Sequence, residues 1–99
     1  MKIRQAFGQA LKKARKAHGL TQEDFSEVSS RTYLSTLERG NKSPTLDKIN
    51  ALSQTIGIHY LSLLTLACLY SETENDVDSI LERIKFEINK IKGGTDSGI

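Results

Sequence analysis

The sequence predicts an all-α protein with six helices, five of them before Tyr70 and the sixth close to the C-terminus. Apolar residues recur at the spacing of amphipathic helices, glycines follow several of these runs, and no segment alternates with the two-residue period of a strand. A chain of 99 residues, 37% of them hydrophobic, has the size of one small domain with one core.

The first helix is expected over residues 3–18, with Gly19 as its C-terminal stop. Its inward face is formed by Ile3, Phe7, Ala10, Leu11, Ala14 and Ala17. Its polar face carries the run KKARK, and residues 1–48 hold ten Lys or Arg against five acids, whereas residues 49–99 hold four against seven. This uneven charge favours a polyanionic partner for the first half, unless the basic run is only a solvated helix face.

The stretch TQEDFSEVSSRTYLSTLERG contains two short helices with a very tight connection. Thr21 caps the first of them, and acids in its first turn suit the helix dipole. We expect this helix to make roughly two turns, with Phe25 and Val28 facing inward.

The next helix is expected over residues 31–39, capped by Ser30 and ended by Gly40. Leu34 and Leu37 point inward. The remaining faces of this helix are therefore left to solvent or to a partner.

The stretch GNKSP is the clearest loop of the first sixty residues, and it leads into a fourth helix over residues 45–56, closed by Gly57. A fifth helix follows over residues 59–70, and its sequence YLSLLTLACLY is more apolar than one buried face requires. Because this run is far shorter than the ~20 residues of a membrane span and no export signal precedes it, we expect a soluble, cytoplasmic protein without a membrane partner.

A sixth helix is expected over residues 74–92, since its sequence starts acidic and ends basic, as the helix dipole favours. Its apolar residues are spaced 4, 3, 4 and 3, the heptad rhythm of a helix packed against a partner helix. They are Val77, Leu81, Ile84, Ile88 and Ile91. The tail over residues 93–99 is expected to be disordered.

Catalytic and metal chemistry find no support in the composition. Cys68 is the only cysteine, and only His18 and His59 accompany it as soft ligands, so neither a disulfide nor a metal cluster is expected. Paired carboxylates, Cys/His arrangements and glycine-rich phosphate loops at workable spacing are lacking. We therefore expect no enzyme, no cofactor and no small-molecule substrate.

The segment LTQEDFSEVSSRTYLSTLERG, with the following SPTL and IGI, resembles the helix-turn-helix family of phage repressors, Cro proteins and their bacterial relatives, of the xenobiotic-response-element type. The resemblance covers roughly residues 5–65. It implies a five-helix, repressor-like DNA-binding domain over residues 1–70 and a sequence-specific transcriptional regulator. Residues 71–92 are then a C-terminal dimerisation helix.

The resemblance implies that the helix over residues 31–39 enters the major groove of double-stranded DNA. By position in the family pattern, the base-reading residues fall on Arg31, Thr32 and Thr36. Arginine can grip guanine with two hydrogen bonds, and threonine can offer its methyl to thymine or its hydroxyl to a base or phosphate.

Further positions are expected to contact the DNA backbone and to orient the protein without reading sequence. They are Gln22, Ser30, Tyr33, Ser35, Arg39, Asn41 and Lys42. For some of them an alternative to DNA contact stays open. The Tyr33 ring could instead pack on the preceding helix, and Arg39, Asn41 and Lys42 could instead form an ordinary solvated loop.

The family also pairs an arginine of the first helix with the glutamate that ends the third, which here are Arg15 and Glu38. If Glu38 is partly buried, loss of Arg15 is expected to cost ~3–5 kcal/mol. The interval from Gln22 to Glu38 is two residues shorter than the family usually has, and the turn lacks the usual glycine. The shortening threatens the angle between the second and third helices, whereas the inward phase of Leu34 and Leu37 is set within the third.

One such domain contacts too few bases to select a site alone, so a two-fold homodimer on a palindromic operator is expected. Its interface is expected at Leu66, Leu69, Tyr70, Val77, Leu81, Ile84, Ile88 and Ile91. The alternative is that the sixth helix folds back on the fifth of its own chain. The alternative function is an antitoxin or protein-interaction adaptor that keeps the fold without binding DNA.

Overall fold

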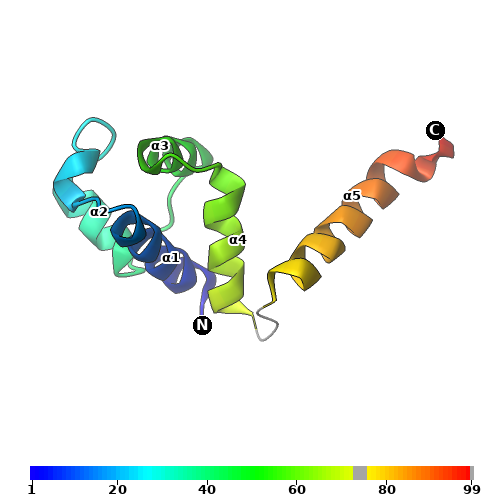
Figure 1. The fold of residues 1–99 in the computed structure, drawn as a ribbon, viewed down its shortest axis with the longest axis horizontal. Helices are drawn as coiled ribbons and strands as arrows, with labels where there is room; N and C mark the ends of the chain where they lie inside the picture. The colour runs from blue at the N-terminus through cyan, green and yellow to red at the C-terminus, as the bar shows by residue number, and fades with distance from the viewer. Residues whose placement is uncertain (73–75, 99) are drawn as a thin grey trace.

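The structure, a computed structural model, describes residues 1–72 and 76–98 and is all-α over these residues (Figure 1). The elements in chain order are α1 (Ile3–Ala17), the 3₁₀ helix η1 (Gln22–Phe25), α2 (Arg31–Glu38), α3 (Leu46–Ile56), α4 (Tyr60–Ser71) and α5 (Val77–Gly98). The predicted fold class is confirmed, and α1, α2, α3 and α4 begin and end within one residue of their predicted bounds.

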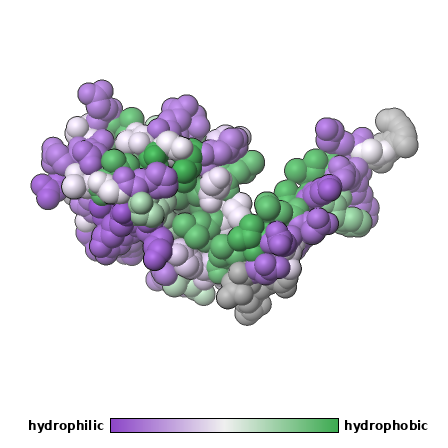
Figure 2. Space-filling view, in the orientation of Figure 1, coloured by the Kyte–Doolittle hydropathy of each residue, from purple (hydrophilic) through white to green (hydrophobic). Residues whose placement is uncertain are grey.

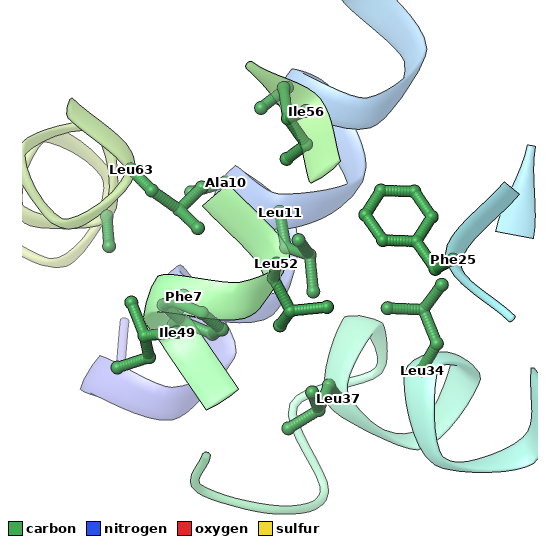
Figure 3. Packing of buried hydrophobic residues seen from close by; sticks show 12 residues of the cluster. Phe7, Ala10, Leu11, Phe25, Leu34, Leu37, Ile49, Leu52, Ile56 and Leu63 are labelled. Atoms are coloured by element: carbon green, nitrogen blue, oxygen red, sulfur yellow. The ribbon is translucent and has the colours of Figure 1, made fainter. Parts of the chain in front are cut away.

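The core lies where α1, η1, α2, α3 and α4 meet (Figure 3). Its largest fully buried apolar side chains are Leu11, Phe25, Leu34, Leu37, Leu52 and Leu63. The leucines of α2 thus enter the core as predicted, which fixes the outward phase of the rest of that helix. Ile3 and Ala17, expected on the inward face of α1, are instead exposed, and they are the first and the last residue of the helix.

Helix ends are set by local hydrogen bonds. The Ser30 hydroxyl oxygen accepts from the Tyr33 amide at 3.1 Å, and the Thr45 hydroxyl oxygen accepts from the Lys48 amide at 3.1 Å. Gly40, after the end of α2, has a φ of 76°. A β-carbon there would also lie 2.8 Å from the Gln5 α-carbon, so only glycine fits.

The second helix differs from its prediction. In place of roughly two α-helical turns, the structure has the four-residue 3₁₀ helix η1 followed by turns. Burial of Phe25 leaves only five residues, 26–30, before α2 begins, and the amides of Val28 and Ser29 both donate to the Phe25 carbonyl to close the turn. A longer helix would use up the residues that reverse the chain.

The last helix also differs in its bounds. Residues 74 and 75, where the sequence predicts its start, lie outside the described residues, and α5 begins at Val77, where the Asp76 carboxylate accepts from the Ser79 amide at 3.3 Å. The helix continues to Gly98, whereas residues 93–99 were expected to be disordered; residue 99 is not described. The glycines at positions 93 and 94 lower the helix propensity of this stretch, but glycine, unlike proline, removes no backbone hydrogen bond, so the helix can continue through them.

Helix α5 projects from the globular body, as Figures 1 and 2 show, and its main contact is with α4 close to its own start. Ile80 is buried there, whereas the heptad residues are exposed, from 39% for Ile84 to 81% for Ile91. Among the described residues, no single helix is long and apolar enough to cross a membrane. Only α3 and α4 taken together reach that length and composition, and they are bent by 103°.

Candidate nucleic-acid interface

The outward face of α2 forms a shallow polar depression of about 280 Å³ together with η1. It is lined by Gln22, Arg31, Thr32, Ser35 and Arg39. Five of the residues predicted to contact DNA are therefore gathered on one surface, although they come from two elements. Because Leu34 and Leu37 are fully buried, this surface cannot rotate away from solvent.

Arg31 stands at the N-terminal end of α2, where base-reading side chains of recognition helices lie. Its guanidinium is 3.8 Å from the Glu23 carboxylate, and the two side chains are 75% and 73% exposed. An exposed ion pair of this kind contributes little, so Arg31 can exchange Glu23 for another acceptor at small cost.

Several hydroxyl groups of α2 already have partners within the protein. The Thr36 hydroxyl donates to the Thr32 carbonyl at 2.8 Å, Ser30 caps the helix, and the Ser35 hydroxyl oxygen accepts from the Arg39 guanidinium. Thr36 therefore presents its methyl group and the lone pairs of its hydroxyl, whereas the Thr32 side chain is exposed.

The predicted ion pair between Arg15 and Glu38 is present and bidentate. Arg15 Nε donates to Glu38 Oε2 at 2.7 Å and Nη2 to Oε1 at 3.0 Å, while Nη1 donates to the Leu20 carbonyl at 2.9 Å. The side chains of the pair are only 9% and 4% exposed, and the hydrogen bonds that Arg15 donates to Glu38 raise the pKa of Arg15 against the opposing effect of burial. The pair joins α1 to the end of α2.

Gln22 extends this network, because its amide nitrogen donates to Glu38 Oε1 at 3.1 Å. Gln22, which was expected to contact the DNA backbone, is thus bound to the same Glu38 carboxylate as Arg15. Among the described residues no hydrogen bond reaches the amide oxygen of Gln22, and this residue also lines the polar depression.

Tyr33 is half-buried and packs against the core, and the Lys48 ammonium lies 5.5 Å from the centre of its ring. The ring therefore packs against the core, and a contact of Tyr33 with the DNA backbone stays a prediction. Asn41 and Lys42 are exposed in the loop after α2, where the Asn41 amide donates to the Thr36 carbonyl at 3.1 Å. Neither of these loop residues lines the depression.

Sequence reasoning missed three residues of this region. Lys12 and Lys16 line a second depression, of about 240 Å³, beside Gln22, Ser35 and Arg39, and their four-residue spacing in KKARK was the available signal. Gly8 has no such signal, yet a β-carbon on it would lie 2.4 Å from the Leu37 carbonyl oxygen. Helix α1 thus packs directly on the backbone of α2.

The residues of the predicted dimer interface lie in three places. Leu66, Leu69, Val77 and Leu81 line an apolar groove of about 540 Å³ between the end of α1, α4 and the start of α5. Tyr70 packs against the core, and Ile84, Ile88 and Ile91 are exposed along the projecting part of α5. Within the described residues, no three His, Cys, Asp or Glu side chains come together as a metal site.

Comparison with known proteins agrees with this geometry. Residues 11–63 match the family described as helix-turn-helix. An HTH-type transcriptional regulator of Sinorhizobium fredii, y4dJ, is 37% identical over 67 residues, which are 66% of this chain and 87% of that protein. The immunity repressor protein of Bacillus phage phi105 is 30% identical over 101 residues, which are 92% of this chain and 70% of that protein.

Two crystal structures of the clp gene regulator ClgR from Corynebacterium glutamicum share the fold. One has a TM-score of 0.65 and 30% identity, over 69% of this chain and 90% of that chain. The other has a TM-score of 0.68 over 96% of this chain and 98% of that chain, at 23% identity, and so speaks for the fold alone. The chain belongs to the helix-turn-helix family, a family of DNA-binding transcriptional regulators.

Proposed function

We propose that the protein is a cytoplasmic transcriptional repressor that places α2 in the major groove of a palindromic operator as a homodimer. The single observation that carries the proposal is the polar face of α2, where Arg31 and Thr32 are exposed beside Gln22 and Arg39. An α-helix fits the major groove of DNA, where each base pair presents a distinct pattern of hydrogen-bond donors and acceptors.

In this proposal Arg31 donates two hydrogen bonds to a guanine, Thr32 contacts the next base, and Thr36 offers its methyl group to a thymine. Thr36 is assigned the apolar role because its hydroxyl hydrogen is bound by the Thr32 carbonyl. Discrimination at each such base pair is worth ~1–3 kcal/mol.

The backbone contacts proposed for the operator surround these readers. They are Gln22, Ser30, Tyr33, Ser35, Arg39, Asn41 and Lys42, with Lys12 and Lys16 added from α1. The basic half of the chain supports this assignment, because phosphate neutralisation and counterion release supply much of the affinity of DNA-binding proteins.

The homodimer is proposed to form through α5 and the apolar groove at its base. The groove and the exposed heptad residues together make an apolar surface that a soluble monomer would leave in water. A two-fold axis would bring the same surface of both copies together and set two α2 helices about one DNA turn, ~34 Å, apart.

The same groove favours the competing function, an adaptor or antitoxin that binds another protein. Selection of bound sequences from random duplex DNA with the intact protein separates the two. We expect a palindromic consensus, and an affinity that falls ~10³-fold or more between about 50 and 200 mM salt if a dimer makes ~6–10 phosphate contacts. Binding without base preference, or without salt dependence, would count against an operator-binding repressor.

Two substitutions test the assigned roles in the same assay. Arg31→Ala should relax base preference at one position of each half-site, with a loss of ~1–3 kcal/mol there. Lys42→Ala should weaken all sequences about equally and reduce the salt slope by about 2, since a dimer loses one phosphate contact in each copy. An unchanged consensus for Arg31→Ala would show that the shortened turn has moved the reading positions.

A further inference from the structure

Lys48, in the first turn of α3, reaches across to the tight connection that precedes α2. Its ammonium donates to the backbone carbonyl of Val28 and lies 5.5 Å from the centre of the Tyr33 ring. Val28 is part of the turn after η1, and Tyr33 is the third residue of α2. The Lys48 side chain therefore links α3 to the turn after η1 and to α2.

The position of Lys48 is unfavourable for its own helix. Thr45 caps α3 and accepts from the Lys48 amide, so Lys48 stands three residues after the cap, where a capping box has Glu or Gln. A cation in the first turn also opposes the positive end of the helix dipole. Both features indicate that this lysine acts outside α3.

The shortened turn before α2 explains why Lys48 binds the Val28 carbonyl. The Phe25 carbonyl already accepts hydrogen bonds from the amides of Val28 and Ser29, and this turn contains no glycine that could continue the chain reversal. The half-buried Val28 carbonyl therefore accepts its hydrogen bond from the Lys48 side chain of α3 and not from another amide of the turn. A cation over an aromatic face adds attraction that strengthens as water is excluded.

We propose that Lys48 is a positioning residue for base reading, which ties the turn and Tyr33 to α3 and so sets the angle at which α2 presents Arg31. Lys48 itself does not touch the operator. The inference rests on the proposed operator binding, and it adds a residue of α3 to the determinants of base preference.

The test compares Lys48→Met, which keeps most of the length of the side chain but removes the donor and the charge, with Lys48→Arg, which keeps both the donor and the charge. Lys90→Met, on the exposed side of α5 outside the heptad positions, is the control for lost charge. For each full-length variant, binding is measured to the selected duplex and to one changed at the base pair assigned to Arg31, over a range of salt concentrations.

We expect Lys48→Met to reduce the preference between the two duplexes by about threefold to tenfold, the scale of coupling through packed side chains, and to leave the salt slope unchanged. Lys48→Arg should retain most of the preference, and Lys90→Met all of it. A salt slope lowered by about 2 in Lys48→Met, one lost phosphate contact in each copy of the dimer, would instead mean that Lys48 contacts phosphate directly. An unchanged preference would likewise overturn the positioning role.

A measurement on the unsubstituted protein keeps the proposal falsifiable if Lys48→Met does not fold. The ring current of Tyr33 should shift the ε-methylene protons of Lys48 upfield in the NMR spectrum of the free protein, and unshifted protons would refute the contact. If the unsubstituted protein shows no base preference at all, the proposed operator binding fails first, whereas a preference that survives in Lys48→Met refutes only the positioning role.

Discussion

At the scale of single residues, one carboxylate joins the elements that carry the polar face of α2. Glu38 accepts two hydrogen bonds from Arg15 and one from Gln22, so α1, η1 and α2 are joined at a nearly buried point. A buried charge of this kind requires its partner, because an uncompensated carboxylate cannot recover its hydration. The pair therefore has a structural role beside the proposed DNA-reading surface.

Arg15→Met should lower the free energy of unfolding by ~3–5 kcal/mol, since it leaves Glu38 without its cation. Urea denaturation followed by circular dichroism measures this loss. The double variant Arg15→Met/Glu38→Met should recover much of it, because a buried ion pair replaced by apolar groups is often near neutral. A single variant as stable as the unsubstituted protein would contradict the assigned role.

At the scale of elements, the orientation of α2 depends on backbone contacts as well as side chains. A β-carbon on Gly8 would lie 2.4 Å from the Leu37 carbonyl oxygen and 2.7 Å from that of Glu38. Both are backbone atoms, which cannot move aside as a flexible side chain would. Gly8 therefore allows α1 to lie directly on the last turn of α2.

Gly8→Ala should destabilise the protein by ~1–3 kcal/mol through overpacking, although alanine is the better helix former. Gly93→Ala is the matched control, because a β-carbon there meets nothing within 4 Å. Thermal unfolding of both variants tests the prediction. A Gly8→Ala protein with a raised or unchanged midpoint would mean that the two helices can separate without cost.

At the scale of the whole molecule, α5 is the feature that a monomer leaves unexplained. Its 22 residues span ~33 Å as a helix, most of it beyond the body. Helices in proteins gain most of their stability from packing of an apolar face, and the exposed heptad residues of α5 leave such a face in water. A second copy of the chain supplies the partner surface that the proposed dimer requires.

Sedimentation should show a dimer at micromolar concentration for the intact protein and a monomer for a version ending at Tyr70. Ile88→Asp should dissociate the dimer by placing a charge on the apolar stripe, whereas Asn89→Asp, which adds the same charge outside it, should not. A monomeric intact protein would refute the dimer, and a truncated dimer would move the interface to α4.

Local patterns in the sequence determined the helices, their caps and the inward phase of α2. Leu34 and Leu37, the stop at Gly40 and the cap at Ser30 depend on residues three or four positions apart, so they can be predicted without tertiary information. The Arg15–Glu38 pair, 23 residues apart, came from the family pattern and not from any local rule.

Only the tertiary structure decided how these elements meet. The 3₁₀ form of η1 follows from burying Phe25 so close to the start of α2, and the reach of Lys48 to Val28 and the contact of Gly8 with Leu37 join residues 20 and 29 positions apart. Such contacts depend on the distance and angle between packed helices, which no periodicity encodes. The sequence by itself thus determined which face of α2 is outward, while packing decided where that face points.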